Sequence, residues 1–127
     1  MSSSILTFCQ IVFFFFFRFK ANLLKLPNLR FSDEPPSSME FLNTKGATIA
    51  CTAAGDPQPI ISWKLVDGSN VTNVSKLRHV TFDGKLVFHS FRPEGFRPDI
   101  HSTVYRCIAS SSVGVIRSLD VVVKGGK

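Results

Sequence analysis

The stretch that decides the fold is Val104-Tyr105-Arg106-Cys107, read together with Cys51 and Trp63 earlier in the same 127-residue chain. Trp63 follows Cys51 by twelve positions, and Tyr105 precedes Cys107 by two. This order is expected where two cysteines on facing β-sheets form a disulfide against a single buried indole. A disulfide persists only in an oxidising compartment. If the domain is cytosolic instead, the two cysteines are buried free thiols.

The sequence around these markers alternates with the two-residue period of β-strands and shows no helical period, so we expect no helix. Strands are predicted over residues 39–44, 47–53, 61–66, 78–82, 85–91, 104–110 and 115–124. Turn residues separate them, and Asp83-Gly84 has the composition of a tight hairpin. The pattern predicts an all-β, immunoglobulin-like (I-set) antiparallel β-sandwich with one inter-sheet disulfide. Its predicted core contains the Cys51–Cys107 bond and Trp63, Leu86 and Tyr105.

Tyr105 lies two residues before the second cysteine, where such folds carry a tyrosine corner. Its phenolic hydroxyl is expected to bind the main chain near the 92–99 loop. Many immunoglobulin domains have an aspartate four residues before this tyrosine, paired with an arginine at the start of the 78–82 strand. Here that position is His101. We therefore expect Arg78 to lack this surface ion pair, whose loss costs about 0–1 kcal/mol.

The chain divides into a predicted apolar leader over residues 1–32, an immunoglobulin-like domain over 33–124 and a linker over 125–127. Within the leader, the run Phe8–Phe17 is apolar except for Gln10. Three interpretations stay open: a divergent signal peptide, a membrane anchor, and a mistranslated intron or gene-model artefact. Cys9 is expected to be a stray thiol rather than a metal ligand or a catalytic group.

The net charge of +6 belongs mostly to the leader. Residues 1–32 contain four basic and no acidic side chains, whereas the remaining 11 basic and 9 acidic residues leave the domain at +2. No basic cluster is expected on one strand face. The charge pattern therefore does not favour nucleic acid as a partner.

Catalytic chemistry is not indicated by the sequence. His79, His89 and His101 are scattered and lack the Cys/His spacing of a zinc site. The serine run 110–112 has no histidine and acid at the spacing of a nucleophilic triad. We therefore predict a binding or spacer module with no catalytic residue, metal, cofactor or small-molecule substrate.

Two glycosylation sequons lie in the polar stretch after the 61–66 strand. Asn70-Val71-Thr72 and Asn73-Val74-Ser75 both satisfy Asn-x-Ser/Thr. Asn70 is the expected preferred site, since its sequon ends in threonine, and crowding should limit occupancy of both sites.

A more specific pattern extends through the second half of the chain. It comprises Asp83-Gly84-Lys85-Leu86-Val87-Phe88, Phe91-Arg92-Pro93-Glu94, Arg97 and His101-x-x-Val104-Tyr105-Arg106-Cys107. With the earlier segments Glu34-Pro35-Pro36, Gly55-Asp56-Pro57-Gln58-Pro59 and Leu77-Arg78, it resembles the first immunoglobulin domain of the Down syndrome cell adhesion molecule (Dscam) family over about residues 33–124. The sequence departs from that family at His89-Ser90, at Gly95-Phe96 and in both sequons.

The resemblance implies an extracellular immunoglobulin module of a neuronal cell-adhesion receptor at the plasma membrane. Members of the family bind homophilically in axon guidance and dendrite self-avoidance. The implied partners are other immunoglobulin domains of the same receptor and homophilic copies on another cell, and the isolated domain is expected to lack adhesive activity. The alternatives are a structural immunoglobulin domain of a cytosolic scaffold or muscle protein, and a secreted ligand-binding immunoglobulin domain.

Overall fold

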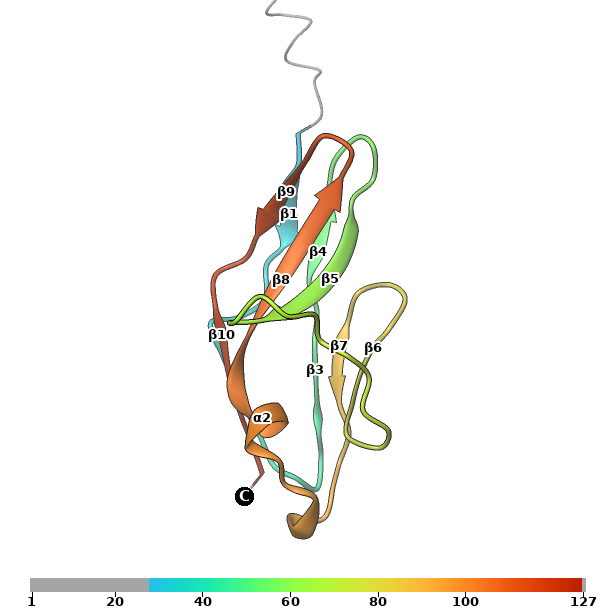
Figure 1. Ribbon diagram of the computed structural model, residues 1–127. Helices are drawn as coiled ribbons and strands as arrows, with labels where there is room; N and C mark the ends of the chain where they lie inside the picture. Colours follow the sequence, from blue (N-terminus) through green and yellow to red (C-terminus); the bar gives the residue numbers. More distant parts are fainter. Residues whose placement is uncertain (1–27, 127) are drawn as a thin grey trace, which may run out of the picture.

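The computed structural model describes residues 28–126, which form two facing layers of β-strands (Figure 1). One layer has the strand order β2, β10, β8, β5, with β9 paired to β8. Its strands are β2 (Ser38–Phe41), β5 (Ile60–Leu65), β8 (Ser102–Ser111), β9 (Gly114–Arg117) and β10 (Val121–Gly125). The other layer contains β3 (Ala47–Ile49), β7 (Leu86–Phe88) and β6 (Arg78–Val80), and the pair β1 (Arg30–Asp33) and β4 (Thr52–Ala54). The predicted all-β sandwich is confirmed.

One strand pair is parallel, so the sandwich is not antiparallel throughout as the sequence pattern predicts. β2 runs parallel to β10, with Ser38 opposite Val122 and Phe41 opposite Gly125. The cause lies in the short connection that contains Pro35 and Pro36. Proline cannot donate to a strand ladder, so β1 ends before this point and the chain resumes as β2 in the opposite layer.

Several strand boundaries differ from the predicted ones. The predicted strand 47–53 is divided into β3 and β4, and the predicted strand 115–124 is divided into β9 and β10. β10 extends to Gly125, inside the predicted linker. β1 begins at Arg30, inside the predicted leader, because this segment pairs with β4 and its Phe31 packs against the core. Periodicity in the sequence does not show such pairing.

Two short helical turns occur before β8, where the sequence pattern predicts none. They are η1 (Pro93–Gly95), a 3₁₀ turn, and α2 (Pro98–His101), a single α-helical turn. Each begins with proline, whose fixed φ suits the first position of a helix. A single turn contains too few residues to produce a helical period in the sequence, which is why the pattern misses both.

The core lies between the layers. The register of β5 against β8 places Trp63 directly opposite Cys107. Ten buried residues form one cluster: Ile49, Cys51, Trp63, Leu86, Phe88, Ile100, Tyr105, Cys107, Val121 and Val123. Each large apolar side chain in such a cluster contributes about 1.5–3 kcal/mol through burial.

The interpretations of residues 1–27, including the apolar run and Cys9, lie outside the described residues. Within the described part of the chain, no helix has the length and apolar character needed to cross a membrane.

Candidate functional site

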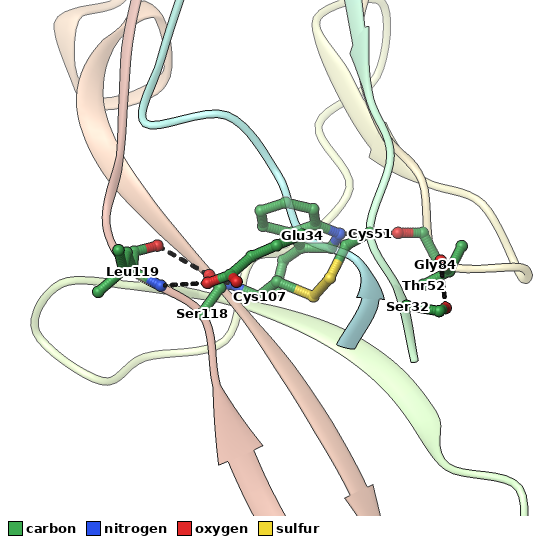
Figure 2. The surroundings of a disulfide bond; sticks show 9 residues. Ser32, Glu34, Cys51, Thr52, Gly84, Cys107, Ser118 and Leu119 are labelled. Atoms are coloured by element: carbon green, nitrogen blue, oxygen red, sulfur yellow. Dashed lines mark hydrogen bonds between the residues drawn. A yellow bond between two sulfur atoms is a disulfide. The ribbon is translucent and has the colours of Figure 1, made fainter. Parts of the chain in front are cut away.

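The disulfide between Cys51 and Cys107 connects the two layers, with Cα atoms 6.6 Å apart (Figure 2). Cys107 lies on β8, and Cys51 lies between β3 and β4. Trp63 is 2% exposed, and its indole Nε1 donates a hydrogen bond of 2.8 Å to the carbonyl of Gly84. The turn before β7 therefore satisfies the one polar atom of the buried indole.

Ser118 holds the irregular segment between β9 and β10 against the strand that carries Cys107 (Figure 2). Its main-chain N–H donates to the Cys107 carbonyl at 2.8 Å, and its hydroxyl accepts the Cys107 N–H at 2.9 Å. The same hydroxyl donates to the carbonyl of Leu119, whose N–H donates to Glu34 at 3.2 Å. Ser118 is buried. A residue without an acceptor here would leave a main-chain N–H unpaired beside the disulfide.

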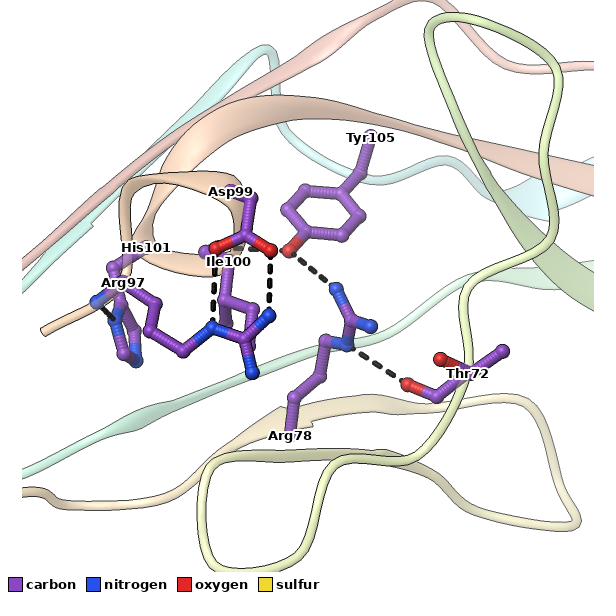
Figure 3. A network of polar contacts seen from close by, with 7 residues as sticks. All are labelled: Thr72, Arg78, Arg97, Asp99, Ile100, His101 and Tyr105. Atoms are coloured by element: carbon purple, nitrogen blue, oxygen red, sulfur yellow. Dashed lines mark hydrogen bonds and ion pairs between the residues drawn. The ribbon is translucent and has the colours of Figure 1, made fainter. Parts of the chain in front are cut away.

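Tyr105 connects β8 to the helical turn α2 (Figure 3). Its hydroxyl donates to the Ile100 carbonyl at 2.7 Å and accepts a hydrogen bond of 3.1 Å from Nη1 of Arg78. The side chain is fully buried, and this burial raises the pKa of the Tyr105 hydroxyl. The contact with the main chain just before β8 confirms the predicted tyrosine corner.

Arg78 is buried rather than lying at the surface. Its Nε donates to the Thr72 carbonyl at 3.0 Å, and its guanidinium carbon lies 6.0 Å from the centre of the Tyr105 ring. Within residues 28–126 it forms no ion pair. The hydroxyl of Tyr105 supplies a buried acceptor for the guanidinium (Figure 3).

The carboxylate of Asp99 pairs with Arg97 instead. Nη2 of Arg97 lies 2.6 Å from one oxygen of Asp99, and Nε donates to the other at 3.2 Å. The hydrogen bonds from Arg97 lower the pKa of the Asp99 carboxyl. Arg97 is about half exposed and Asp99 is more exposed still, so water screens the pair and it adds little to the stability of the domain.

His101 is fully buried at the end of α2. Its Nδ1 accepts the main-chain N–H of Arg97 at 2.9 Å, and its ring stacks on Phe91 with 3.9 Å between ring centres. The ring of Phe96 lies 5.6 Å away. Burial lowers the pKa of the His101 imidazole, because the apolar surroundings disfavour its charged form. A neutral ring therefore stands where many immunoglobulin domains have a carboxylate.

A groove of about 530 Å³ lies beside this histidine, at the end of the domain where β2 and β10 finish. Phe41, Leu42 and Phe96 contribute apolar surface to it, and Glu40 and Lys124 contribute charge. Leu42 and Phe96 are 50% and 43% exposed. The sequence pattern does not predict this surface, because its residues come from three separate segments.

The two sequons lie in the exposed loop between β5 and β6. The side-chain oxygen of Asn70 accepts a hydrogen bond of 2.9 Å from Lys64, and that of Asn73 accepts the Val80 N–H at 2.9 Å. In both cases the contact uses the oxygen of the amide, so the nitrogen that would carry a glycan takes no part in it.

Two of the three histidines that look scattered in the sequence come together in the structure. His79 Nδ1 and His89 Nε2 are 2.8 Å apart, because β6 and β7 form a hairpin. No group of three or more histidine, cysteine, aspartate or glutamate side chains suited to a metal ion occurs among residues 28–126.

The chain was compared with family models, with curated proteins and with solved structures. No family model matches the chain, whereas the other two comparisons find clear relatives. Curated relatives include cell adhesion molecule Dscam2 of Drosophila melanogaster, 46% identical over 91 residues, which is 72% of this chain and 4% of the relative. They also include Dscam1 of the same organism, 45% identical over 94 residues, which is 74% of this chain and 5% of the relative.

A solved structure of the N-terminal four Ig domains of Dscam1 isoform 4.44 superposes with a TM-score of 0.76 at 42% identity, covering 78% of this chain and 25% of that one. The chain belongs to the Dscam family. This match also confirms the immunoglobulin-like class of the sandwich. The Dscam relatives are many times longer than this chain, which spans 4–5% of the two curated relatives given above.

Proposed function

We propose that this chain is an extracellular immunoglobulin module of a neuronal Dscam-type receptor and corresponds to its first immunoglobulin domain. In that receptor it contributes to homophilic cell–cell recognition, axon guidance and dendrite self-avoidance. The observation that carries the proposal is the 46% identity to a cell adhesion molecule over 91 residues. A catalytic role forms no part of this proposal.

Two features of the domain support a place outside the cell. The first is the disulfide, which would not persist in a reducing cytosol. The second is the exposure of Asn70 and Asn73 in one loop, where a glycan on either would project into solvent. A cytosolic scaffold or muscle domain needs neither feature.

The redox state of Cys51 and Cys107 distinguishes the extracellular proposal from the cytosolic alternative. In the test, the full chain is expressed as a secreted protein in cultured cells and treated with a maleimide reagent before and after reduction. The labelled cysteines are then located by peptide mass. We expect neither cysteine to react before reduction and both to react afterwards. Labelling of both cysteines in the secreted, folded protein without reductant would contradict the extracellular proposal.

Adhesion is proposed to need neighbouring immunoglobulin domains. The groove containing Leu42 and Phe96 is the proposed contact surface for such a neighbour, since both side chains are about half exposed although apolar. Beads coated with this chain alone should stay dispersed, whereas beads coated with a longer receptor fragment should aggregate. Aggregation of beads coated with the single domain would refute the proposal that adhesion needs neighbouring domains. If the beads also captured other proteins, the secreted ligand-binding alternative would be favoured.

Glycosylation is proposed at Asn70 in preference to Asn73. Intact mass of the secreted chain should show one glycan that disappears in N70Q, and the matched N73Q variant should keep it. A glycan that persists in N70Q and is lost in N73Q would reverse the assignment.

A further inference from the structure

The pair formed by His79 and His89 lies on the outer face of the β3–β7–β6 sheet. His79 is opposite Val87 in the ladder between β6 and β7. His89 follows β7 by one residue and shares the face of Val87, since side chains two residues apart on a strand lie on one side. On the opposite face, Leu86 and Phe88 are buried in the core. The two imidazoles are therefore diagonal neighbours on a surface that only partly covers them.

The ring nitrogens of this pair already have the spacing of two ligands on one metal ion. His79 Nδ1 and His89 Nε2 are 2.8 Å apart, and the ring planes are inclined by 33° with 4.8 Å between centres. Two nitrogens at right angles around a metal, each about 2.0 Å from it, are separated by about 2.8 Å. In the metal-free domain a proton occupies this gap, since one ring must donate to the other. When a metal ion binds, the donor ring changes tautomer, so that this proton moves to its other nitrogen, and both rings rotate until the lone pairs of the two facing nitrogens converge on the ion.

We propose that His79 and His89 form a two-histidine site for a divalent transition-metal ion, with Cu²⁺ as the preferred ion. Imidazole nitrogen suits Cu²⁺, which binds nitrogen sites more tightly than the other divalent ions of its row. Tetragonal Cu²⁺ accepts ligands at right angles, whereas tetrahedral Zn²⁺ requires a wider spacing of about 3.3 Å at the same bond length. Water completes the coordination, because two imidazoles leave the remaining positions open.

His79 lies in β6, next to Arg78, and His89 directly follows β7. The hairpin that brings the two together is held from the inside. Arg78, the first residue of β6, is buried, and the main-chain N–H of His89 donates to the Leu77 carbonyl at 3.0 Å. The spacing of the imidazoles is thus set by the packed sheet.

Titration of the full, oxidised chain with Cu²⁺ in a buffer that does not coordinate metals tests the site. Calorimetry gives the affinity, and electron paramagnetic resonance counts the nitrogen atoms on the ion. We expect the wild-type chain to bind one Cu²⁺ ion at this site through two imidazole nitrogens. H79N and H89N should each weaken it about 100-fold, because the second imidazole binds at high effective concentration once the first is attached.

The control variant is T48A. Thr48 lies opposite Val87 on the same outer face and provides no imidazole, so its loss should leave the Cu²⁺ affinity unchanged. Circular dichroism checks that each variant retains the sandwich. Equal binding by wild type and the H79N/H89N double variant would assign the copper to other groups of the chain and overturn the proposal. So would a single-histidine variant that binds as tightly as wild type, or a wild-type chain that binds no Cu²⁺.

Discussion

Replacing Tyr105 by phenylalanine removes one oxygen atom from the centre of the domain. The phenyl ring keeps nearly the same volume, so the change creates no large cavity. The hydroxyl has two partners: it donates to the Ile100 carbonyl at 2.7 Å and accepts from Arg78 at 3.1 Å. The substitution therefore tests the polar network rather than the packing.

The expected loss of stability follows from these two contacts. A neutral hydrogen bond contributes about 1 kcal/mol, and one to a charged group contributes about 1.5–3 kcal/mol. Since Arg78 is only 5% exposed, water cannot readily replace the lost acceptor. We expect Y105F to lower the free energy of unfolding by about 2.5–4 kcal/mol, a large part of the 5–15 kcal/mol typical of a whole domain.

The assay is urea or guanidinium unfolding of the oxidised chain, monitored by the fluorescence of Trp63. A double-mutant cycle with R78M isolates the contact between Tyr105 and Arg78 from the hydrogen bond to Thr72 that R78M also removes. In the R78M background, Y105F should cost only about 1 kcal/mol, the value of the bond to Ile100.

The control is R106Q, which removes the exposed ion pair of Arg106 with Asp120 and should cost about 0–1 kcal/mol. Two results would refute the reasoning. One is a cost for Y105F no larger than that of R106Q. The other is the same cost for Y105F with and without Arg78, since the guanidinium would then not depend on the hydroxyl.

Two further perturbations test the turn at the indole and the buried imidazole. G84A should destabilise the domain by about 2–4 kcal/mol, because Gly84 has φ +94° and an added Cβ would lie 2.7 Å from Ile61. G68A is the matched control: Gly68 also has a positive φ, of +89°, but has nothing within 4 Å of an added Cβ, so similar unfolding midpoints for the two variants would contradict the packing argument. Burial lowers the pKa of the His101 imidazole in the folded chain. As the pH falls below about 6.5, the imidazole therefore becomes protonated in the unfolded chain at a higher pH than in the folded chain. This favours the unfolded state, so the free energy of unfolding should decrease as the pH falls. Urea unfolding between about pH 5 and 8 should show this slope in wild type and a flatter one in H101Q; an unchanged slope would assign the titration to another group.

Much of the fold could be predicted from local patterns. The spacing of Cys51, Trp63 and Cys107 indicates facing sheets, and the alternation of apolar residues locates most strands to within a few residues. The site was predicted less completely. The tyrosine corner follows from the position of Tyr105, but the burial of Arg78 does not, because it depends on an acceptor 27 residues away. Ser118 was missed for the same reason, since its partner lies on another strand.

By itself, the sequence predicted two facing sheets around a single indole, with Cys51 and Cys107 placed to join them, since this needs only residue identity, spacing and a two-residue period. Only the tertiary structure decided that β2 pairs parallel to β10. It also decided that the buried Arg78 donates a hydrogen bond to Tyr105 and that the imidazoles of His79 and His89 lie in contact. These features depend on which strands become neighbours and in what register. A strand pattern records which side chains share a face, whereas the partner across that face is set by packing of the whole domain.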